Sequence, residues 1–330
     1  MSAQIIHGDC LEKLRDLPDN SVDSLVSDAP GAISFMGKNW DSDKGGRDHW
    51  IAWVQSVMVE CLRVLKPGAH GLVWGLPRAS HWTATALENA GFEIRDVVTH
   101  CFGTGFPKSL DISKAIDKAS GAEREVIGKS DNWRPSQSKG GAGFDATVGS
   151  GGGTLASIEI TAPSTDAAKQ WQGWGTALKP ACEMWILVRK PCSEKTVAAN
   201  VLKWGLGGIN VDGCRIDGKP RTTHLKQEAS RGGASRFFYV AKASKSDKGE
   251  GNAHPTVKSQ ALMSYLIKLV TPPNGTVLDP FMGSGSTGVA AVKSGFSFIG
   301  IELEDEYVAI AQKRLSHAEA LLAKASGDCR

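Results

Sequence analysis

The sequence lacks the features that mark membrane proteins and disulfide-stabilised proteins. Its 330 residues contain no apolar run of about 18 residues, which argues against a membrane-spanning helix. The chain begins directly with a strand-like segment at residues 4–7 and leaves no room for a signal peptide, so we expect a cytoplasmic protein. The seven cysteines never form a CxxC pair, which argues against a disulfide framework and against a zinc site.

A glycine-rich turn near the C-terminus is the most informative segment that is present. Residues 276–288 read TVLDPFMGSGSTG, and residues 297–302 read SFIGIE. This pattern predicts a buried strand, a turn that lets the backbone approach a ligand, a helix, and a second strand that ends on the acid Glu302. An acid about 20 residues beyond such a turn can accept hydrogen bonds from ribose hydroxyls. The turn lacks both the GxGxxG and the GK[ST] patterns that bind phosphates, which favours a nucleoside without phosphates.

Charge is distributed unevenly along the chain. Residues 186–248 contain 13 Lys and Arg against 5 Asp and Glu, although the whole chain carries a net charge of only +3. The remainder of the protein is therefore slightly acidic. A basic segment on such a protein predicts a polyanionic partner, and the alternative is a solvated polar surface.

Strand and helix signals alternate along the N-terminal third of the chain. Apolar runs at residues 24–27 and 71–74 predict buried strands, and helical spacing at residues 50–65 predicts a helix between them. This alternation predicts an α/β fold with a mostly parallel sheet and helices on both faces. We expect the segments around Ile94 and Trp185 to add an antiparallel hairpin to that sheet.

The composition between these elements predicts the domain organisation. Residues 1–103, 182–194 and 252–330 are expected to form the domain that carries the sheet. Residues 104–181 include glycine-rich runs and are expected to form a long, partly mobile insertion, because so long a connection is more often a functional lid or binding loop than core. Residues 195–251 mix glycine, basic and aromatic residues and are expected to form a separate, irregular module.

Four segments resemble the motifs of one enzyme family. They are residues 8–11 (GDCL), 25–41 (LVSDAPGAISFMGKNWD), 254–258 (HPTVK) and 279–285 (DPFMGSG). Together and in this order they resemble amino-group DNA methyltransferases dependent on S-adenosylmethionine, of the permuted kind in which the catalytic motif precedes the cofactor motif. The likeness is closest to site-specific methylases of phages and prophages. It implies a class I (Rossmann-like) methyltransferase fold, an inserted DNA-recognition module at residues 195–251, and double-stranded DNA as the partner.

The resemblance also implies which residues hold the cofactor S-adenosylmethionine. Asp9 is expected beside its adenine, Glu302 on its ribose, and the HPTVK segment on its methionine part. The expected cofactor-binding residues are Asp9, Cys10, His254, Thr256, Lys258, Asp279, Phe281, Gly283, Ser284, Gly285 and Glu302. Glu302 could instead belong to a solvated acidic cluster, and His254 could be a structural histidine.

The acceptor chemistry falls on residues 28–31, which read Asp-Ala-Pro-Gly. Methylation of an exocyclic amine requires its lone pair, which is delocalised into the base, to point at the methyl donor. The resemblance implies that the Asp28 carboxylate and the carbonyl of Ala29 or Pro30 accept both amino hydrogens and stabilise the positive charge that develops on the nitrogen. Pro30 is expected to hold this turn rigid. Without the resemblance, Asp28 could simply end a strand.

This segment departs from the family pattern at two positions. The family usually has proline in place of Ala29, and often has an aromatic residue, which stacks on the extruded base, in place of Gly31. Phe35 and Trp40 are the nearest rings that could replace it, although each could equally be core packing. The departure leaves open a weakened or inactive enzyme.

The basic segment is expected to contact DNA phosphates. The expected residues are Lys203, Arg215, Arg231, Arg236 and Lys242. The aromatic run at residues 237–239 could fill the gap left by an extruded base, or could form a buried strand edge.

The expected activity is methyl transfer to the amino group of adenine in DNA, because Asp at the head of the catalytic motif is commoner among the adenine enzymes of the family. Cytosine N4 methylation, adenine methylation in RNA, and DNA binding by a weakened or inactive homologue are the alternatives. No metal is expected, and the oligomeric state, monomer or dimer, is left open.

Overall fold

The chain divides into two compact units, which we describe separately. The computed structural model describes residues 2–34, 37, 39–102, 109–130, 158–178, 181–215, 237–239, 242–248, 252, 254 and 256–327. Residues Met1–Phe102 and Cys182–Arg330 make up one unit, the sheet unit, and Gly103–Ala181 make up the other, the insertion unit. No helix in the described ranges is long and apolar enough to cross a membrane.

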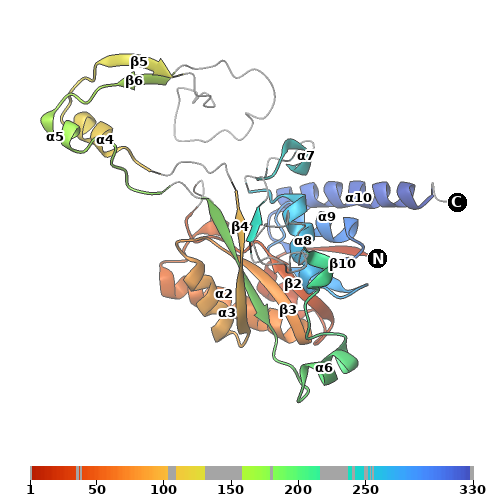
Figure 1. Cartoon of the computed structure of the whole chain (residues 1–330). Helices are drawn as coiled ribbons and strands as arrows, with labels where there is room; N and C mark the ends of the chain where they lie inside the picture. Colours follow the sequence, from red (N-terminus) through yellow and green to blue (C-terminus); the bar gives the residue numbers. More distant parts are fainter. Residues whose placement is uncertain are drawn as a thin grey trace, which may run out of the picture. The chain divides into compact units, whose positions relative to one another are not determined.

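The sheet unit is built on eight strands in the order β1-β10-β9-β2-β3-β7-β4-β8 (Figure 1). The strands are β1 (Ala3–His7), β2 (Val22–Ser27), β3 (Leu65–Gly75), β4 (Glu93–Cys101), β7 (Cys182–Arg189), β8 (Phe237–Tyr239), β9 (Thr276–Asp279) and β10 (Ser297–Glu302). Strand β7 runs antiparallel to both of its neighbours, and the other described pairs are parallel. The predicted mostly parallel sheet, with an antiparallel pair at Ile94 and Trp185, is confirmed.

Helices cover both faces of this sheet (Figure 1). One face carries α1 (Cys10–Arg15), α2 (Arg47–Val64) and α3 (Ser80–Asn89), and the other carries α8 (Gln260–Val270), α9 (Ser286–Lys293) and α10 (Asp305–Gly327). Shorter elements are η2 (Asn39–Asp41), α6 (Val197–Trp204), η3 (Asp212–Cys214) and α7 (Lys245–Lys248).

Alternation along the strands explains why both faces are apolar. Successive strand residues point to opposite faces. Leu25 and Val73 belong to the core cluster with α1 to α3, whereas their neighbours Val26 and Leu72 belong to the cluster with α8 to α10. Central strands buried on both faces therefore read as continuous apolar runs.

Strand β3 begins earlier than the sequence suggests. A helix stop at residues 66–68 and a strand from residue 71 were expected, but β3 begins at Leu65, directly after α2. Its register with β2 shifts between Val22 and Ser24, so the Pro-Gly step is an irregularity inside the strand. Gly68 has φ +82°, and a Cβ there would lie 2.3 Å from the Asn200 side chain, so this position requires glycine.

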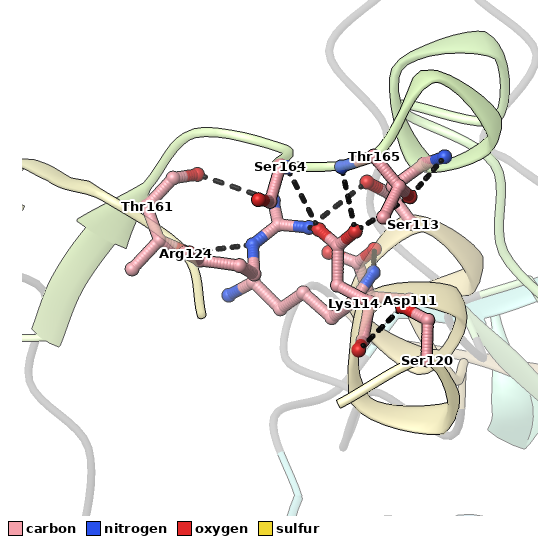
Figure 2. A network of polar contacts seen from close by, with 10 residues as sticks. Asp111, Ser113, Lys114, Ser120, Arg124, Thr161, Ser164 and Thr165 are labelled. Atoms are coloured by element: carbon pink, nitrogen blue, oxygen red, sulfur yellow. Dashed lines mark hydrogen bonds and ion pairs between the residues drawn. The ribbon is translucent and has the colours of Figure 1, made fainter. Parts of the chain in front are cut away.

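The insertion unit contains α4 (Ile112–Ala119), β5 (Val126–Ser130), β6 (Ile158–Thr161) and α5 (Asp166–Gln170), and its strands β5 and β6 pair antiparallel. Figure 2 shows the polar network that joins α4 to the segment between β6 and α5. The buried carboxylate of Asp117 accepts hydrogen bonds from Arg124 Nη1 (2.6 Å), the Ser164 N–H (3.0 Å), the Thr165 N–H (3.0 Å) and the Thr165 hydroxyl (2.8 Å). Arg124 also donates to Ser113 and Thr161. A buried charge is tolerated here because it is paired and fully hydrogen-bonded.

Replacing Asp117 with asparagine is expected to destabilise the insertion unit. Burial raises the pKa of Asp117, but its donors outweigh burial and lower the pKa to about 2 from 3.8. The carboxylate therefore stabilises the unit in full above about pH 4, and this stabilisation is lost as the pH falls through about 2. Hydrogen exchange of the α4 amides in the full chain should show faster exchange in the variant at neutral pH, with a smaller difference from the parent near pH 2.

A matched control is Asp166→Asn on α5, since Asp166 pairs with Lys169 on the surface. Equal protection of α4 in the two variants would mean that Asp117 does not hold the unit together.

The expected recognition module is only partly described. Residues 216–236 lie outside the described residues, and with them Arg231 and Arg236. The aromatic run at residues 237–239 forms β8, which pairs with β4 at one end of the strand order. The recognition role of residues 195–251 stays a prediction.

Candidate active site

Four acidic residues stand at the carboxyl ends of parallel strands. Asp9 and Asp28 follow β1 and β2, and Asp279 and Glu302 end β9 and β10. Parallel strands end at one edge of a sheet, which is where ligands bind in open α/β folds. A single pocket is lined by all four acids.

Most of the expected site residues line this pocket, which we call the strand-end pocket. Beyond the four acids, they are Cys10, Pro30, Trp40, His254, Thr256, Lys258, Phe281, Gly283 and Ser284. The sequence did not indicate several further lining residues, including Lys44, Trp53, Met282 and Tyr307. Ala29, Gly31 and Gly285 are not among the lining residues, and Phe35 lies outside the described residues.

The glycine turn and Glu302 are joined by hydrogen bonds. The Gly283 N–H donates to Glu302 Oε2 at 2.8 Å, and the Glu304 N–H donates to Oε1 at 2.9 Å. Gly283 has φ +54°, and a Cβ there would lie 3.0 Å from His254 Nε2. Burial raises the pKa of Glu302, although these backbone donors oppose the shift. Glu302 thus fixes the turn while it faces the pocket.

Asp279 and Asp9 have structural partners of their own. Asp279 accepts from Ser27 Oγ (2.7 Å), Thr287 Oγ1 (2.6 Å) and the Phe281 N–H (3.1 Å). Burial raises the pKa of Asp279 to about 7 against the effect of these donors. Asp9 caps α1 by accepting from the N–H groups of its first turn. Both carboxylates therefore shape the pocket wall as well as line it.

Burial also determines the state of Cys10. It raises the pKa of the thiol to about 12, with Asp9 adding to the shift, so Cys10 lines the pocket as an uncharged group.

Aromatic rings form two groups in the pocket. Trp53 and Phe281 lie with ring centroids 5.6 Å apart, and Lys44 Nζ lies 4.5 Å from the Trp53 ring. His254 stacks on Trp40 at 6.3 Å and meets Tyr307 edge-on at 4.4 Å. Trp40, one of the two rings expected to stack on a base, therefore already packs against His254.

Asp28 lies in a cluster of buried charges. Lys258 Nζ is 2.9 Å from Asp28 Oδ1 and 3.7 Å from Glu183 Oε2, and it lies 4.4 Å from the centre of the Trp74 ring. Burial raises the pKa of Asp28, and the nearby Lys258 opposes this. Burial lowers the pKa of Lys258, but the two carboxylates outweigh it and the pKa is raised. Lys258, expected on the cofactor, thus directly contacts the expected catalytic acid.

Glu183 and Trp74 were not identified from the sequence. Glu183 is the second residue of β7 and Trp74 is near the end of β3, and Gly75 and Met184 are register partners. Because β7 is antiparallel, its first residues lie at the same sheet edge as the last residues of β3. No local pattern around Glu183 could have revealed this, since it depends on the pairing of distant strands.

The Trp74 ring lies beside the backbone of Gly31. A Cβ on Gly31 would lie 3.4 Å and 3.6 Å from two atoms of the Trp74 ring. The Gly31 N–H donates to Asp41 Oδ1 at 2.5 Å. An aromatic ring from β3 therefore lies next to this backbone, at a distance at which a Cβ on residue 31 would make ordinary van der Waals contact with it.

The expected DNA-binding residues are dispersed. Lys203 pairs with Glu194 at 2.6 Å, Arg215 pairs with Asp212 at 2.5 Å, and Lys242 lies 3.4 Å from Glu183. Of these three, Lys242 alone is next to the charge cluster around Asp28. The structure does not bring Lys203 or Arg215 to the strand-end pocket.

Comparison with known proteins relates the chain to DNA methyltransferases. Residues 153–313 match the N6/N4 DNA methylase family. The DNA adenine methyltransferase YhdJ of Escherichia coli (strain K12) is 27% identical, over 95% of this chain and 83% of its own. The segment matched by the family model, residues 153–313, contains the HPTVK motif, the glycine turn and Glu302, but not Asp9 or Asp28.

Solved structures share the fold. The crystal structure of M1.HpyAVI in complex with SAM has a TM-score of 0.50 and 21% identity, and covers 94% of this chain and 98% of its own. The cytosine-N4-specific PvuII DNA methyltransferase has a TM-score of 0.55 and 16% identity, and covers 95% of this chain and 86% of its own. The match to the DNA methylase family model over residues 153–313 and the likeness to YhdJ along almost the whole chain support an S-adenosylmethionine-dependent DNA amino-methyltransferase.

Proposed function

We propose that this DNA methylase transfers a methyl group from S-adenosylmethionine to the N6 amino group of adenine in double-stranded DNA. The observation that carries the proposal is that Asp28 and the Glu302-bound glycine turn line the same pocket. An acceptor for amino hydrogens and a site for a nucleoside cofactor are thereby brought together.

The residues of the pocket fit the cofactor. Gly283 brings backbone close to the cavity where a side chain would strike His254, and Glu302 beside it can accept from ribose hydroxyls. Trp53 and Phe281 offer aromatic surface to an adenine ring. The turn contains no phosphate-binding pattern, which favours a nucleoside without phosphates as the ligand.

The acceptor side performs its task through hydrogen bonding. Bound S-adenosylmethionine supplies an electrophilic methyl group on its sulfonium. The Asp28 carboxylate and the carbonyl of Ala29 or Pro30 accept the two hydrogens of the target amine, which directs its lone pair out of the base plane. The same oxygens stabilise the positive charge that grows on the nitrogen during transfer. A preorganised carboxylate costs no reorganisation at that moment.

Reaching the amine requires the adenine to leave the duplex, because its N6 is otherwise paired and stacked. Lys203, Arg215, Arg231, Arg236 and Lys242 are proposed to neutralise phosphates, which sets affinity rather than sequence specificity. Residues 195–251 are proposed to supply the recognition contacts.

The product of the reaction tests this proposal. Duplex DNA is incubated with the protein and S-adenosylmethionine, digested to nucleosides and analysed by mass spectrometry. We expect N6-methyladenine in duplex DNA and none in an RNA competitor. N4-methylcytosine as the sole product would overturn the adenine assignment. This alternative is tested because the chain shares its fold with the cytosine-N4-specific PvuII enzyme. Cofactor binding in calorimetry without any methylated product would favour a homologue that only binds DNA, in keeping with the altered Ala29 and Gly31.

A further inference from the structure

Glu183 is the centre of a charge cluster to which the cofactor and acceptor roles assign no function. Its Oε2 accepts from Trp74 Nε1 at 3.2 Å and lies 3.7 Å from Lys258 Nζ. Its Oε1 lies 3.4 Å from Lys242 Nζ. His100 on β4 is the register partner of Glu183, and its Nδ1 atom lies 3.8 Å from Glu183 Oε2. Burial raises the pKa of Glu183, but Lys258, His100 and Lys242 outweigh burial and hold the pKa well below its usual range.

Lys258 lies between two carboxylates rather than on one. Its side chain is only 13% exposed, and its ammonium is closer to Asp28 (2.9 Å) than to Glu183 (3.7 Å). In a poorly solvated site, an ammonium with a single partner would be held tightly by that partner. With a second carboxylate in reach, attraction to Glu183 offsets part of the attraction to Asp28. Trp74 steadies the arrangement, since its N–H holds Glu183 and its ring lies beside the ammonium.

This sharing matters for the acceptor carboxylate. Asp28 and Lys258 alone would be a neutral pair, whereas Asp28, Lys258 and Glu183 together carry one negative charge. Lys242 faces the other oxygen of Glu183, and its half-exposed side chain is screened by solvent. A carboxylate that is less fully neutralised accepts a hydrogen bond from an amine more strongly, and it stabilises positive charge on that amine better.

We propose that Glu183 is a positioning residue for methyl transfer: it shares the Lys258 ammonium with Asp28 and so keeps the Asp28 carboxylate able to accept a hydrogen bond from the entering amino group. The inference rests on the proposed function and adds a residue to it. Glu183 acts through Lys258, so it need not touch the substrate, the cofactor or the reacting atoms.

The pH dependence follows from the charges that face Asp28 among the described residues. Lys258 lowers the pKa of Asp28, and Glu183 and Asp41 raise it, while Asp279 is a further carboxylate nearby. Removing the negative charge of Glu183 should therefore lower the pKa of Asp28, and removing the positive charge of Lys258 should raise it.

The test compares Glu183→Gln and Lys258→Gln in pH profiles of kcat. Glu183→Gln should lower kcat about tenfold at neutral pH and move the acidic limb of the profile to lower pH. Lys258→Gln should move that limb to higher pH. Glu93→Gln is the matched control, since Glu93 is an ion-paired carboxylate at the other end of β4, bound to Arg189; its profile should follow the parent.

A second readout does not depend on activity. In protein with labelled lysine side chains and without cofactor or DNA, NMR titration should show a lower pKa for the Lys258 ammonium in Glu183→Gln than in the parent. The NMR signal of Lys258 is identified as the one that is missing from the spectrum of the Lys258→Gln variant.

The outcomes separate the two proposals. A parent protein that methylates no nucleic acid would defeat the proposed function, and the lysine titration would still decide whether Glu183 shares the ammonium. An active parent whose Glu183→Gln variant keeps both the pH profile and the Lys258 titration unchanged would overturn the role of Glu183. If Glu183→Gln did not fold, the pH profile of kcat for Lys258→Gln would be the deciding measurement. The proposed role of Glu183 would also be overturned if the acidic limb of that profile stayed in place or moved to lower pH.

Discussion

Replacing Asp28 with alanine is expected to lower kcat for methyl transfer by about 10³-fold, the loss typical of removing a preorganised transition-state partner. The variant loses the carboxylate that accepts an amino hydrogen and balances the charge on the nitrogen. The affinity for S-adenosylmethionine should stay nearly unchanged, because the glycine turn is held by Glu302 and not by Asp28, and Lys258 keeps Glu183 as a partner. Transfer of labelled methyl to duplex DNA measures the first quantity, and calorimetry measures the second.

Two further variants make this test specific. Asp28→Asn keeps the shape of the side chain but loses its charge, and it should be almost as impaired as the alanine variant. Asp16→Ala removes an exposed acid at the end of α1 and should retain the parental rate. The fold should survive in the Asp28 variants, because Lys258 keeps Glu183 as a partner within 3.7 Å. Parental activity in Asp28→Ala would contradict the catalytic assignment.

Replacing Glu302 with alanine is expected to weaken cofactor binding about 100-fold, which corresponds to about 2.7 kcal/mol. The substitution takes away the acceptor of the Gly283 and Glu304 N–H groups, so the turn loses the contacts that orient it, of which the one to Gly283 is part-buried. It also takes away the proposed acceptor for the ribose hydroxyls. Calorimetric titration with S-adenosylmethionine measures the effect.

The pH dependence of cofactor binding should follow Glu302 as well. Burial raises the pKa of Glu302, so its carboxylate becomes protonated at a higher pH than that of an exposed acid. Affinity should therefore be full when Glu302 is ionised and should decline as the pH falls through the raised pKa. Glu302→Gln should abolish this dependence. Glu304→Ala is the control, because Glu304 contributes its backbone N–H and not its side chain to the contact. Equal cofactor affinity in Glu302→Ala and Glu304→Ala would exclude the proposed role.

Much of the fold follows from local patterns in the sequence. Apolar runs in the sequence correctly indicate the strands β2 and β9, and the segment around Trp185 forms β7 as expected. The start of β3 could not be predicted, because Pro67 and Gly68 look like a turn and become part of a strand only through pairing with β2. The permuted class and the relationship to phage enzymes stay predictions.

The sequence by itself determined that Asp9, Asp28, Asp279 and Glu302 share one edge of the sheet. Each stands at or just beyond the end of a parallel strand, and the ends of parallel strands meet regardless of their order. Only the tertiary structure decided what faces Asp28. Lys258, Trp74 and Glu183 come from separate segments, and β7 brings Glu183 to this edge because it runs antiparallel between β3 and β4. Such contacts depend on strand order and register, which arise from packing between distant segments and leave no local pattern in the chain.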